Sequence, residues 1–436
     1  MPKKIAVFCT WPVEYVHRLA LNTAVFYSKQ GDTVDLIDVS YLAVPIYSLL
    51  HNKHKYLSGI SLLLLRRLFR KNSYYLNFKS IKRSNDLLGI QIGYKVFSPL
   101  FLFSFKRKLK NDRRYDLYLD SLFLDASGAQ KDEISLKKRI RGSSILAYVK
   151  SYLALNRSRL KHYDEWIIYN GRFPVDYMLR EIARENQITS KFFEVGFREN
   201  SFCIYEESPH SLSEHKKNAL TFWHESNNFE RNSGAMEYLE NRIRHKDSKS
   251  LFWSGNQSIG NVRNLPKKKI LTFFLSTEGE LASVPFETKN IFEGQNESVI
   301  WIIQNIDFQF WHVVIRGHPN RNLNRPKDLI LKQIPQLNIR GEDITYISEE
   351  DSDDSIELIK RSDLICLYDS SIGIDAIYLK KPTMIFGKPL FTALCNNPLK
   401  STADINFSKI DSLFYDIRKL KIWAWYAYQY GIEFFV

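Results

Sequence analysis

The sequence has little cysteine, and its cysteines are not paired. Cys9, Cys203, Cys366 and Cys395 are the only four among 436 residues, and none belongs to a C-x-x-C motif. Disulfide frameworks and cysteine-based zinc sites use close cysteine spacings, so the sequence predicts neither. Few and dispersed cysteines are typical of a reducing compartment, and we therefore expect a cytoplasmic protein.

Long hydrophobic runs are also missing. No stretch reaches the roughly 20 apolar residues that a membrane-spanning helix needs. The nearest, residues 87–105, is interrupted by Lys95 and Pro99. Residues 5–9 are too short for the apolar part of a signal peptide, and Pro12 and Glu14 follow at once.

Acidic residues are fewer than basic ones: the sequence has 48 Asp and Glu and 62 Lys and Arg, which gives a net charge of +14. Such an excess implies an anionic partner, which leaves nucleic acid, a membrane surface or a phosphorylated substrate. The content of 44% hydrophobic and 25% charged residues is that of a globular protein. The length suggests two or three domains.

Positive charge is concentrated in residues 41–114, where basic clusters alternate with apolar runs. We interpret about 41–160 as a basic helical insertion in the first domain. One interpretation is a patch for anionic lipid head groups or a lipid-linked acceptor, at the inner membrane. The other is a solvated basic face beside core helices. No nucleic-acid recognition motif accompanies the charge, so nucleic acid is not an expected partner. The clusters are Arg66, Arg67, Arg70 and Lys71, and Lys106, Arg107, Lys108, Lys110, Arg113 and Arg114.

Around this region the sequence alternates between strand and helix patterns. Residues 4–9, 16–29 and 33–39 predict a parallel strand–helix–strand unit. The glycine-rich dinucleotide fingerprint is absent after the first strand, where TWPVEY stands, so NAD binding is not indicated. The pattern returns with strands at 165–169 and 191–197, separated by a helix at 174–186.

A polar, Gly/Ser/Asn-rich segment at 246–269 is the best linker in the chain. It predicts an N-terminal domain over 1–245 and a C-terminal domain over 270–436, with further strands at 270–275, 312–316 and 363–368. The aromatic tail after 422 is expected to pack back on the first domain or to touch a membrane. The predicted fold class is α/β, with two Rossmann-like domains facing a cleft, an arrangement called GT-B.

Residues 363–386 predict a strand, a Ser/Gly turn, a short helix and a second strand. A turn that leaves a strand and opens a helix presents free backbone N–H groups and partial positive charge, which favour phosphate or carboxylate. Ser370 and Ser371 would add hydroxyl donors, and Gly373 would let the backbone approach a ligand. The alternative is an ordinary capped helix.

Two other predicted strand ends of the C-terminal domain carry polar residues. Ser276 and Thr277 follow one strand, while Arg316 and His318 follow another. Hydroxyls, a guanidinium and an imidazole beside a helix N-terminus are suited to a phosphate-bearing ligand. No metal site is expected, because the acidic run 349–354 fits better as the cap and first turn of a helix.

In the N-terminal domain, Asn170, Arg172 and Glu194 lie near predicted strand ends, where ligands of open parallel sheets bind. A Glu in an apolar strand is costly unless it is paired or faces a cleft. The alternative for Glu194 is a buried ion pair with an arginine such as Arg172. His210 follows a loop and, by itself, is more often a structural histidine than a catalyst.

These residues resemble the motifs of the bacterial capsule polysaccharide biosynthesis glycosyltransferases, which include the β-linked Kdo transferases. The resemblance covers most of the chain from Glu165 onward, with Asp375 where the family usually has Glu. The matching positions are Asn170-Gly171-Arg172, Glu194, Gly196, Pro209-His210-Ser211, Ser276, Glu280, Gln295, Arg316, His318-Pro319, Ser370-Ser371, Asp375-Ala376 and Lys381-Pro382.

The resemblance implies transfer of a sugar from a nucleotide-sugar, a substrate rather than a cofactor, to a capsule or lipopolysaccharide glycan. It implies that His318, Ser370 and Ser371 hold the donor phosphate with support from Arg316. Asp375 and Glu280 are implied ribose or base contacts. Glu194 is implied to be the general base, or the nucleophile if configuration is retained.

Three alternatives remain open. Polyol-phosphate transferases of teichoic acid synthesis have a similar His-Pro loop and Ser-Ser turn, but they use a CDP-alcohol. A non-catalytic protein with this fold would bind glycan or membrane only. A nucleotide-sugar epimerase on the same scaffold would form product without an acceptor.

Overall fold

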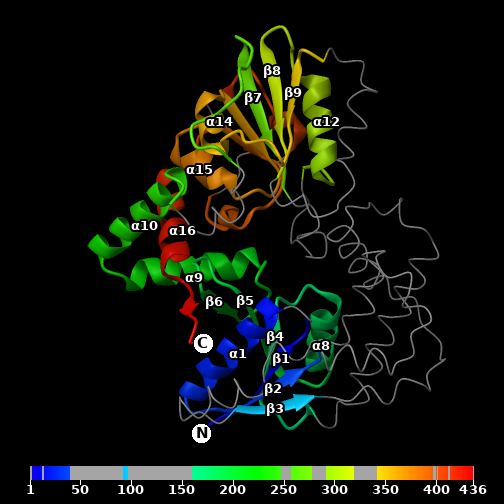
Figure 1. The fold of residues 1–436 in the computed structure, drawn as a ribbon, viewed down its shortest axis with the longest axis vertical. Coiled ribbons are helices and arrows are strands. Elements are labelled where there is room, and N and C mark those ends of the chain that lie inside the picture. The colour runs from blue at the N-terminus through cyan, green and yellow to red at the C-terminus, as the bar shows by residue number, and fades with distance from the viewer. Residues whose placement is uncertain are drawn as a thin grey trace, which may run out of the picture. The chain divides into compact units, whose positions relative to one another are not determined.

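The computed structural model in Figure 1 describes residues 2–11, 14–39, 92–96, 160–246, 257–276, 291–318, 341–395, 399, 401–410 and 413–435. The chain forms two compact units. The N-terminal unit comprises Met1–Ser211, Ala282–Val284 and Gly431–Val436. The C-terminal unit comprises Leu212–Leu281 and Pro285–Tyr430.

The N-terminal unit is built on a seven-stranded sheet in the order β12-β6-β5-β4-β1-β2-β3. The five strands from β5 to β3 run parallel, and β6 and β12 are antiparallel additions at one edge. In chain order the parallel part reads 3-2-1-4-5, which is the Rossmann arrangement. The strands are β1 (Lys4–Cys9), β2 (Thr33–Asp38), β3 (Ile92–Val96), β4 (Glu165–Tyr169), β5 (Thr189–Val195), β6 (Ser201–Tyr205) and β12 (Ile432–Glu433).

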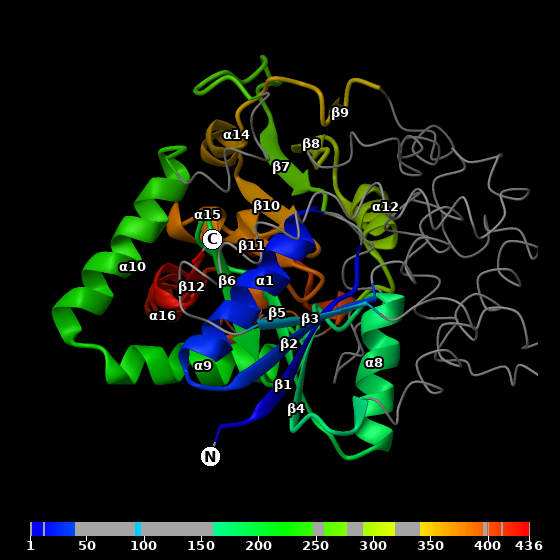
Figure 2. The same ribbon diagram turned by 60° about the horizontal axis from the view of Figure 1, so that its bottom comes forward.

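Helices α1 (Glu14–Lys29) and α8 (Pro174–Glu185) lie on opposite faces of this sheet in both ribbon views (Figures 1 and 2). With both faces covered, β4 is buried along its whole length, as is β1 after its first residue. This explains why both strands read as continuous apolar runs rather than as alternating patterns. Pro174 begins α8, a position where its missing N–H costs nothing.

Strand β3 corrects the prediction that about 41–160 is a helical insertion, because it places a strand within that range. It pairs in parallel with β2, from Val34 opposite Ile92 to Asp38 opposite Val96. The segment IGYKV alternates between apolar and other residues, a period-two pattern that marks a strand. The rest of the predicted insertion, including its basic clusters, lies outside the described residues.

The C-terminal unit has an all-parallel five-stranded sheet in the order β9-β8-β7-β10-β11. Numbered along the chain, this order is again 3-2-1-4-5, so both units are Rossmann-like, as the sequence predicts. Figure 1 shows α12 on one side of the sheet and α14 and α15 on the other. The bounds are β7 (Lys269–Phe274), α12 (Gln295–Asn305), β8 (Trp311–Arg316), β9 (Ile344–Ile347), α14 (Ser355–Arg361), β10 (Leu364–Leu367), α15 (Ile372–Tyr378) and β11 (Thr383–Ile385).

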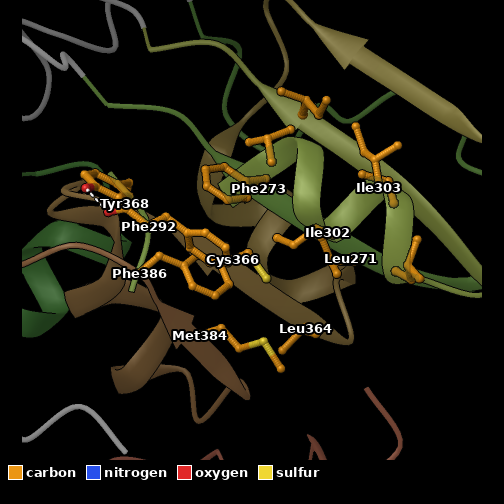
Figure 3. Close-up of a cluster of buried hydrophobic side chains, with 14 of the residues drawn as sticks. Leu271, Phe273, Phe292, Ile302, Ile303, Leu364, Cys366, Tyr368, Met384 and Phe386 are labelled. Atoms are coloured by element: carbon orange, nitrogen blue, oxygen red, sulfur yellow. Dashed lines mark hydrogen bonds between the residues drawn. The ribbon is translucent and has the colours of Figure 1, made fainter. Parts of the chain in front are cut away.

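The core between α12 and the sheet is rich in aromatic residues (Figure 3). The Phe273 and Phe386 rings are parallel, with centroids 6.1 Å apart, and Phe292 meets Phe386 edge-on at 5.4 Å. The buried Tyr368 hydroxyl donates to the Phe292 carbonyl at 3.1 Å. This bond satisfies a polar atom that would otherwise be costly inside the core.

A layer of helices completes the C-terminal unit. Helix α16 (Ile417–Gln429) packs on α9 (Leu212–Glu225) and α10 (Asn228–Ile243), and short 3-10 turns η8 (Leu390–Ala393) and η9 (Thr402–Asp404) precede it. The chain between 212 and 243 thus forms two helices. The second begins after Asn227, whose side chain accepts from the Glu230 N–H.

The segment predicted as a linker contacts the C-terminal unit wherever it is described. The backbone N–H of Gly260 donates to Asp354, and Arg263 binds Asp353 through its backbone and its guanidinium. The unit boundary consequently follows Ser211 and differs from the predicted limits. Asp354 also caps α14 by accepting from the Ile356 N–H, which confirms that the acidic run serves as a helix start.

The last residues of the chain return to the N-terminal unit. Strand β12 pairs with β6, and the Phe435 N–H donates to the Asn22 side chain in α1. The Lys29 ammonium lies 4.0 Å from the centre of the Phe435 ring. Among the described helices, none combines the length and the apolar character needed to cross a membrane.

Candidate functional site

Three neighbouring strands of the C-terminal sheet end at the same level. The register places Leu367 of β10 beside Phe274 of β7, and Phe274 beside Arg316 of β8. Ser370, Ser276 and His318 follow these positions by two or three residues. The strand order reverses between β7 and β10, and this switch point is where Rossmann-like sheets bind ligands.

Ser276 is held by Gln295, in the first turn of α12. Both the backbone N–H and the hydroxyl of Ser276 donate to Gln295 Oε1, at 2.6 and 3.0 Å. The Gln295 side chain is fully buried, and its Nε2 has no hydrogen-bond partner among the described residues. An unsatisfied buried donor of this kind is costly by about 1–3 kcal/mol and is available to a ligand oxygen.

Arg316 lies beneath this edge rather than on it. Its side chain is buried and donates to the backbone carbonyls of Ser348, Asp351 and Asp353. Burial lowers the pKa of the guanidinium, and the nearby carboxylates of Asp353 and Asp351 oppose that shift. These contacts tie Arg316 to the loop that follows β9, and its predicted support of the phosphate-binding residues is not tested by them. Direct contact with a donor phosphate stays a prediction.

The Ser370–Ser371 turn opens α15. Ser370 is buried and its Oγ accepts from the Ile372 N–H at 3.4 Å, whereas Ser371 is exposed. Packing explains why position 373 is a glycine: an added Cβ would lie 2.6 Å from the Phe391 ring. The close approach at Gly373 is thus to a core side chain of the same unit.

Asp375 is part of a buried ion pair. Its two carboxylate oxygens accept from Arg242 Nε and Nη2 at 2.8 and 2.7 Å, and Arg242 also approaches the Ser371 carbonyl at 3.4 Å. The arginine thus connects α10 to the turn that carries both serines. The ribose contact implied for Asp375 stays a prediction. Thr277 and Glu280 lie outside the described residues, and His318 is half-buried at the end of β8.

A second group of polar residues lies at the carboxyl ends of β4 and β5, and β4 borders the switch point between β1 and β4. Asn170 and Gly171 have φ values of 49° and 81°, which turn the chain sharply after β4. The Asn170 amide donates to Glu194 Oε2, and the Val195 N–H donates to Glu194 Oε1 at 2.8 Å. The predicted residues Asn170 and Glu194 are therefore in contact, and the backbone N–H of Arg172 donates to Asn170 Oδ1 at 3.3 Å.

Aromatic rings surround this group. Phe173 stacks on Tyr169 with centroids 5.9 Å apart and meets Trp11 edge-on at 4.8 Å. The Arg172 guanidinium lies 4.4 Å from the centre of the Phe173 ring. Desolvation of the Tyr15 hydroxyl, together with the Glu194 charge, raises the pKa of this tyrosine, although 41% of the residue's surface is exposed. Aromatic side chains beside a few polar groups are a composition that small-molecule sites share.

Sequence reasoning missed Asp176, in the first turn of α8. The side chain is fully buried, and neither carboxyl oxygen has a hydrogen bond of normal geometry within the described part of the chain. Burial raises the pKa of this carboxyl well above its ordinary value, nearby Thr10 opposes the shift, and Glu194 adds to it. An Asp in a first helical turn resembles an ordinary partner of the helix dipole, so the sequence alone gives no warning.

His210 lies in the turn before α9. It is half-buried, and its backbone N–H donates to Ser208 Oγ at 3.3 Å. A role on the acceptor side stays a prediction.

The two Rossmann-like units with polar strand ends define the fold class expected of a GT-B protein. No protein-family model and no curated protein matches the sequence. Among solved structures, the chain is similar to two β-Kdo transferase structures of Thermosulfurimonas dismutans KpsC, the class that the sequence motifs resemble. The 2,4 transferase is 10% identical, with 61% of this chain and 79% of that chain covered and a TM-score of 0.40.

The 2,7 transferase is 12% identical, with 64% and 80% of the two chains covered and a TM-score of 0.37. A UDP-GlcNAc 2-epimerase from Neisseria meningitidis bound to UDP-GlcNAc is 13% identical, with 99% and 95% covered and a TM-score of 0.28. These TM-scores are too low to support an argument, so the fold assignment is based on the strand orders of the two sheets.

Proposed function

We propose that this protein is a glycosyltransferase that moves a sugar from a CMP- or UDP-linked donor to a growing capsule or lipopolysaccharide glycan. The observation that carries the proposal is the alignment of β10, β7 and β8. It brings Ser370, Ser276 and His318 to one edge of a parallel sheet, at its switch point. Hydroxyl, amide and imidazole donors in that position are suited to a phosphate.

In this proposal the C-terminal unit holds the donor. The Ser370–Ser371 turn contacts the phosphate nearest the sugar, and His318 in its protonated form balances the charge that develops on the departing nucleotide. Ser276 is fixed by Gln295 and supplies one face of the phosphate site. Such charge stabilisation needs neither a metal ion nor a cofactor, so the proposed chemistry is metal-independent.

The N-terminal unit acts on the acceptor. Asn170 and the Val195 N–H hold the two oxygens of Glu194 in place, which orients its carboxylate for one defined task. That task is removal of the proton from the acceptor hydroxyl, or attack on the sugar if configuration is retained. The basic region before residue 160 would contact the anionic surface of the inner membrane or a lipid-linked acceptor.

We expect His318→Ala and Ser371→Ala each to lower turnover by at least about tenfold to a hundredfold, by analogy with the loss of one charge-stabilising donor. The measurement is nucleotide release from a panel of nucleotide-sugars by the purified full-length protein, with and without a glycan acceptor. His224→Ala and Ser233→Ala are matched controls, because both residues are exposed on helices of the same unit.

The same assay separates the alternatives. CMP release from CDP-glycerol would indicate polyol-phosphate transfer, and product formed without an acceptor would indicate an epimerase. Glycan or lipid binding that survives His318→Ala, without any nucleotide release, would indicate a non-catalytic protein. Unchanged turnover in both variants would exclude the assigned phosphate site.

A further inference from the structure

The first strand–helix–strand unit gathers three metal-ligating side chains. Cys9 and Asp38 are the last residues of β1 and β2, and the parallel register places them directly beside each other. His17 comes from the first turn of α1, which follows β1. The ligand atoms of all three side chains lie within 4.8 Å of one another. Within the described ranges, this is the one group of three or more such side chains that meets this spacing.

The ligand atoms of these three side chains are those that one kind of cation prefers. Sulfur, imidazole nitrogen and carboxylate oxygen are the ligands that Zn²⁺ takes, at about 2.3, 2.0–2.1 and 2.0–2.2 Å. These bond lengths give tetrahedral ligand separations of roughly 3.3–3.8 Å, so only small side-chain movements are needed to close the site. Magnesium and calcium prefer all-oxygen sites and would not select a thiol.

The charges also balance. A bound Zn²⁺ ion would face a thiolate, a carboxylate and a neutral imidazole, which carry two negative charges in all. Cys9 and Asp38 are 1% and 8% exposed, and His17 is half-buried. Burying an isolated charge costs much free energy, so a site whose charges sum to zero is the least costly one at this buried position.

The Trp11 carbonyl provides an outer contact of the type found around metal ligands. The His17 ring makes a hydrogen bond to the Trp11 backbone, and Cys9 Sγ lies 3.8 Å from the Trp11 oxygen. Histidines that bind metals usually donate their other ring N–H to a carbonyl or carboxylate, which fixes the ring and its tautomer.

We propose that Cys9, His17 and Asp38 bind one zinc-class cation, with the fourth position open to water. The ion would join β1, α1 and β2 beside the candidate acceptor site. A search for cysteine pairs overlooks this arrangement, because it uses one cysteine and takes its other ligands from a helix and a neighbouring strand. The site does not depend on the proposed sugar transfer.

The test is a Co²⁺ titration of the full-length protein after chelator treatment and removal of any histidine tag. We expect thiolate-to-cobalt absorption that saturates at one equivalent and is displaced by Zn²⁺. Cys9→Ala should abolish the absorption, and His17→Gln and Asp38→Asn should each weaken binding at least about a hundredfold, more than the effect of an outer contact. Cys366→Ala is the matched control, because Cys366 is equally buried in the other unit.

A second measurement keeps the test decisive if Cys9→Ala folds poorly. Added Zn²⁺ should raise the unfolding midpoint of the wild-type protein, as any ligand specific for the native state does, but not that of Asp38→Asn. No stoichiometric cobalt absorption, or absorption that persists without Cys9, would overturn the proposal. Because these readouts are spectral and thermal, their failure would leave the proposed glycosyl transfer untouched.

Discussion

Replacing Arg242 with alanine is expected to destabilise the C-terminal unit by about 3–5 kcal/mol, the usual cost of leaving one member of a buried ion pair without its partner. The Arg242 side chain is 12% exposed and that of Asp375 is 3% exposed, so neither charge is well solvated. Two parallel hydrogen bonds join them. Without the guanidinium, the Asp375 carboxylate would be left buried and uncompensated in α15.

The measurement is the unfolding of the full-length protein in denaturant, with hydrogen exchange in α10 and α15 reporting on the C-terminal unit. Arg244→Ala is the matched control. Arg244 is 60% exposed and pairs with Glu240 on the helix surface, so its loss should cost at most about 1 kcal/mol. Combining Arg242→Met with Asp375→Leu should recover most of the stability, because it removes both charges together. A small effect of Arg242→Ala alone would contradict this account.

The same ion pair connects stability to the candidate donor site. Arg242 also approaches the Ser371 carbonyl, so it contacts the turn that is proposed to bind phosphate. Asp375 stands where the resembled family usually has Glu, and its shorter side chain is fully engaged by Arg242. The ion pair thus joins α15 to α10, and the ribose contact implied for Asp375 stays a prediction.

The fold could be predicted because the central strands are continuous apolar runs ended by polar turns. Residues 4–9 and 165–169 were predicted as strands with the bounds that β1 and β4 have. Prediction was wrong at β3, because its five residues lie within a long segment dominated by basic and apolar clusters. Its pairing partner β2 is more than 50 residues away, and long-range pairing leaves only a weak local signal.

The sequence allowed us to predict which residues follow the strand ends at the candidate site. It did not allow us to predict the side-chain contacts that hold those residues in place. Ser276, His318 and Ser370 follow apolar strands, and parallel strands end at one edge of their sheet. In contrast, the pairing of Arg242 with Asp375 joins residues 133 positions apart, and nothing in either local sequence indicates it. The Cys9–His17–Asp38 group is hidden for a related reason, since its members are ordinary residues of three separate elements.

Asp176→Asn is expected to stabilise the N-terminal unit, and by more as the pH rises. Burial raises the pKa of the native Asp176 carboxyl, whereas the unfolded chain has an ordinary Asp pKa of about 3.9. Above that pH the native state holds a proton that the unfolded state has released. The wild-type protein therefore loses about 1.4 kcal/mol of stability for each pH unit, until the native carboxyl itself ionises.

The asparagine variant lacks this proton linkage, so its advantage over the wild type should be small near pH 4 and grow toward neutral pH. Denaturant unfolding of the full-length protein at several pH values, with hydrogen exchange in α8, measures the difference. Glu199→Gln in the same unit is the control, since Glu199 is exposed and should change stability by no more than about 0.5 kcal/mol at any pH. A uniform loss of stability in Asp176→Asn would show that the carboxylate is hydrogen-bonded in the native state. A gain in stability that grows with pH would instead show that Asp176 destabilises the native protein. Residues that destabilise a protein are often kept for function, and Asp176 lies near the β1–β4 switch point, where a ligand is expected to bind.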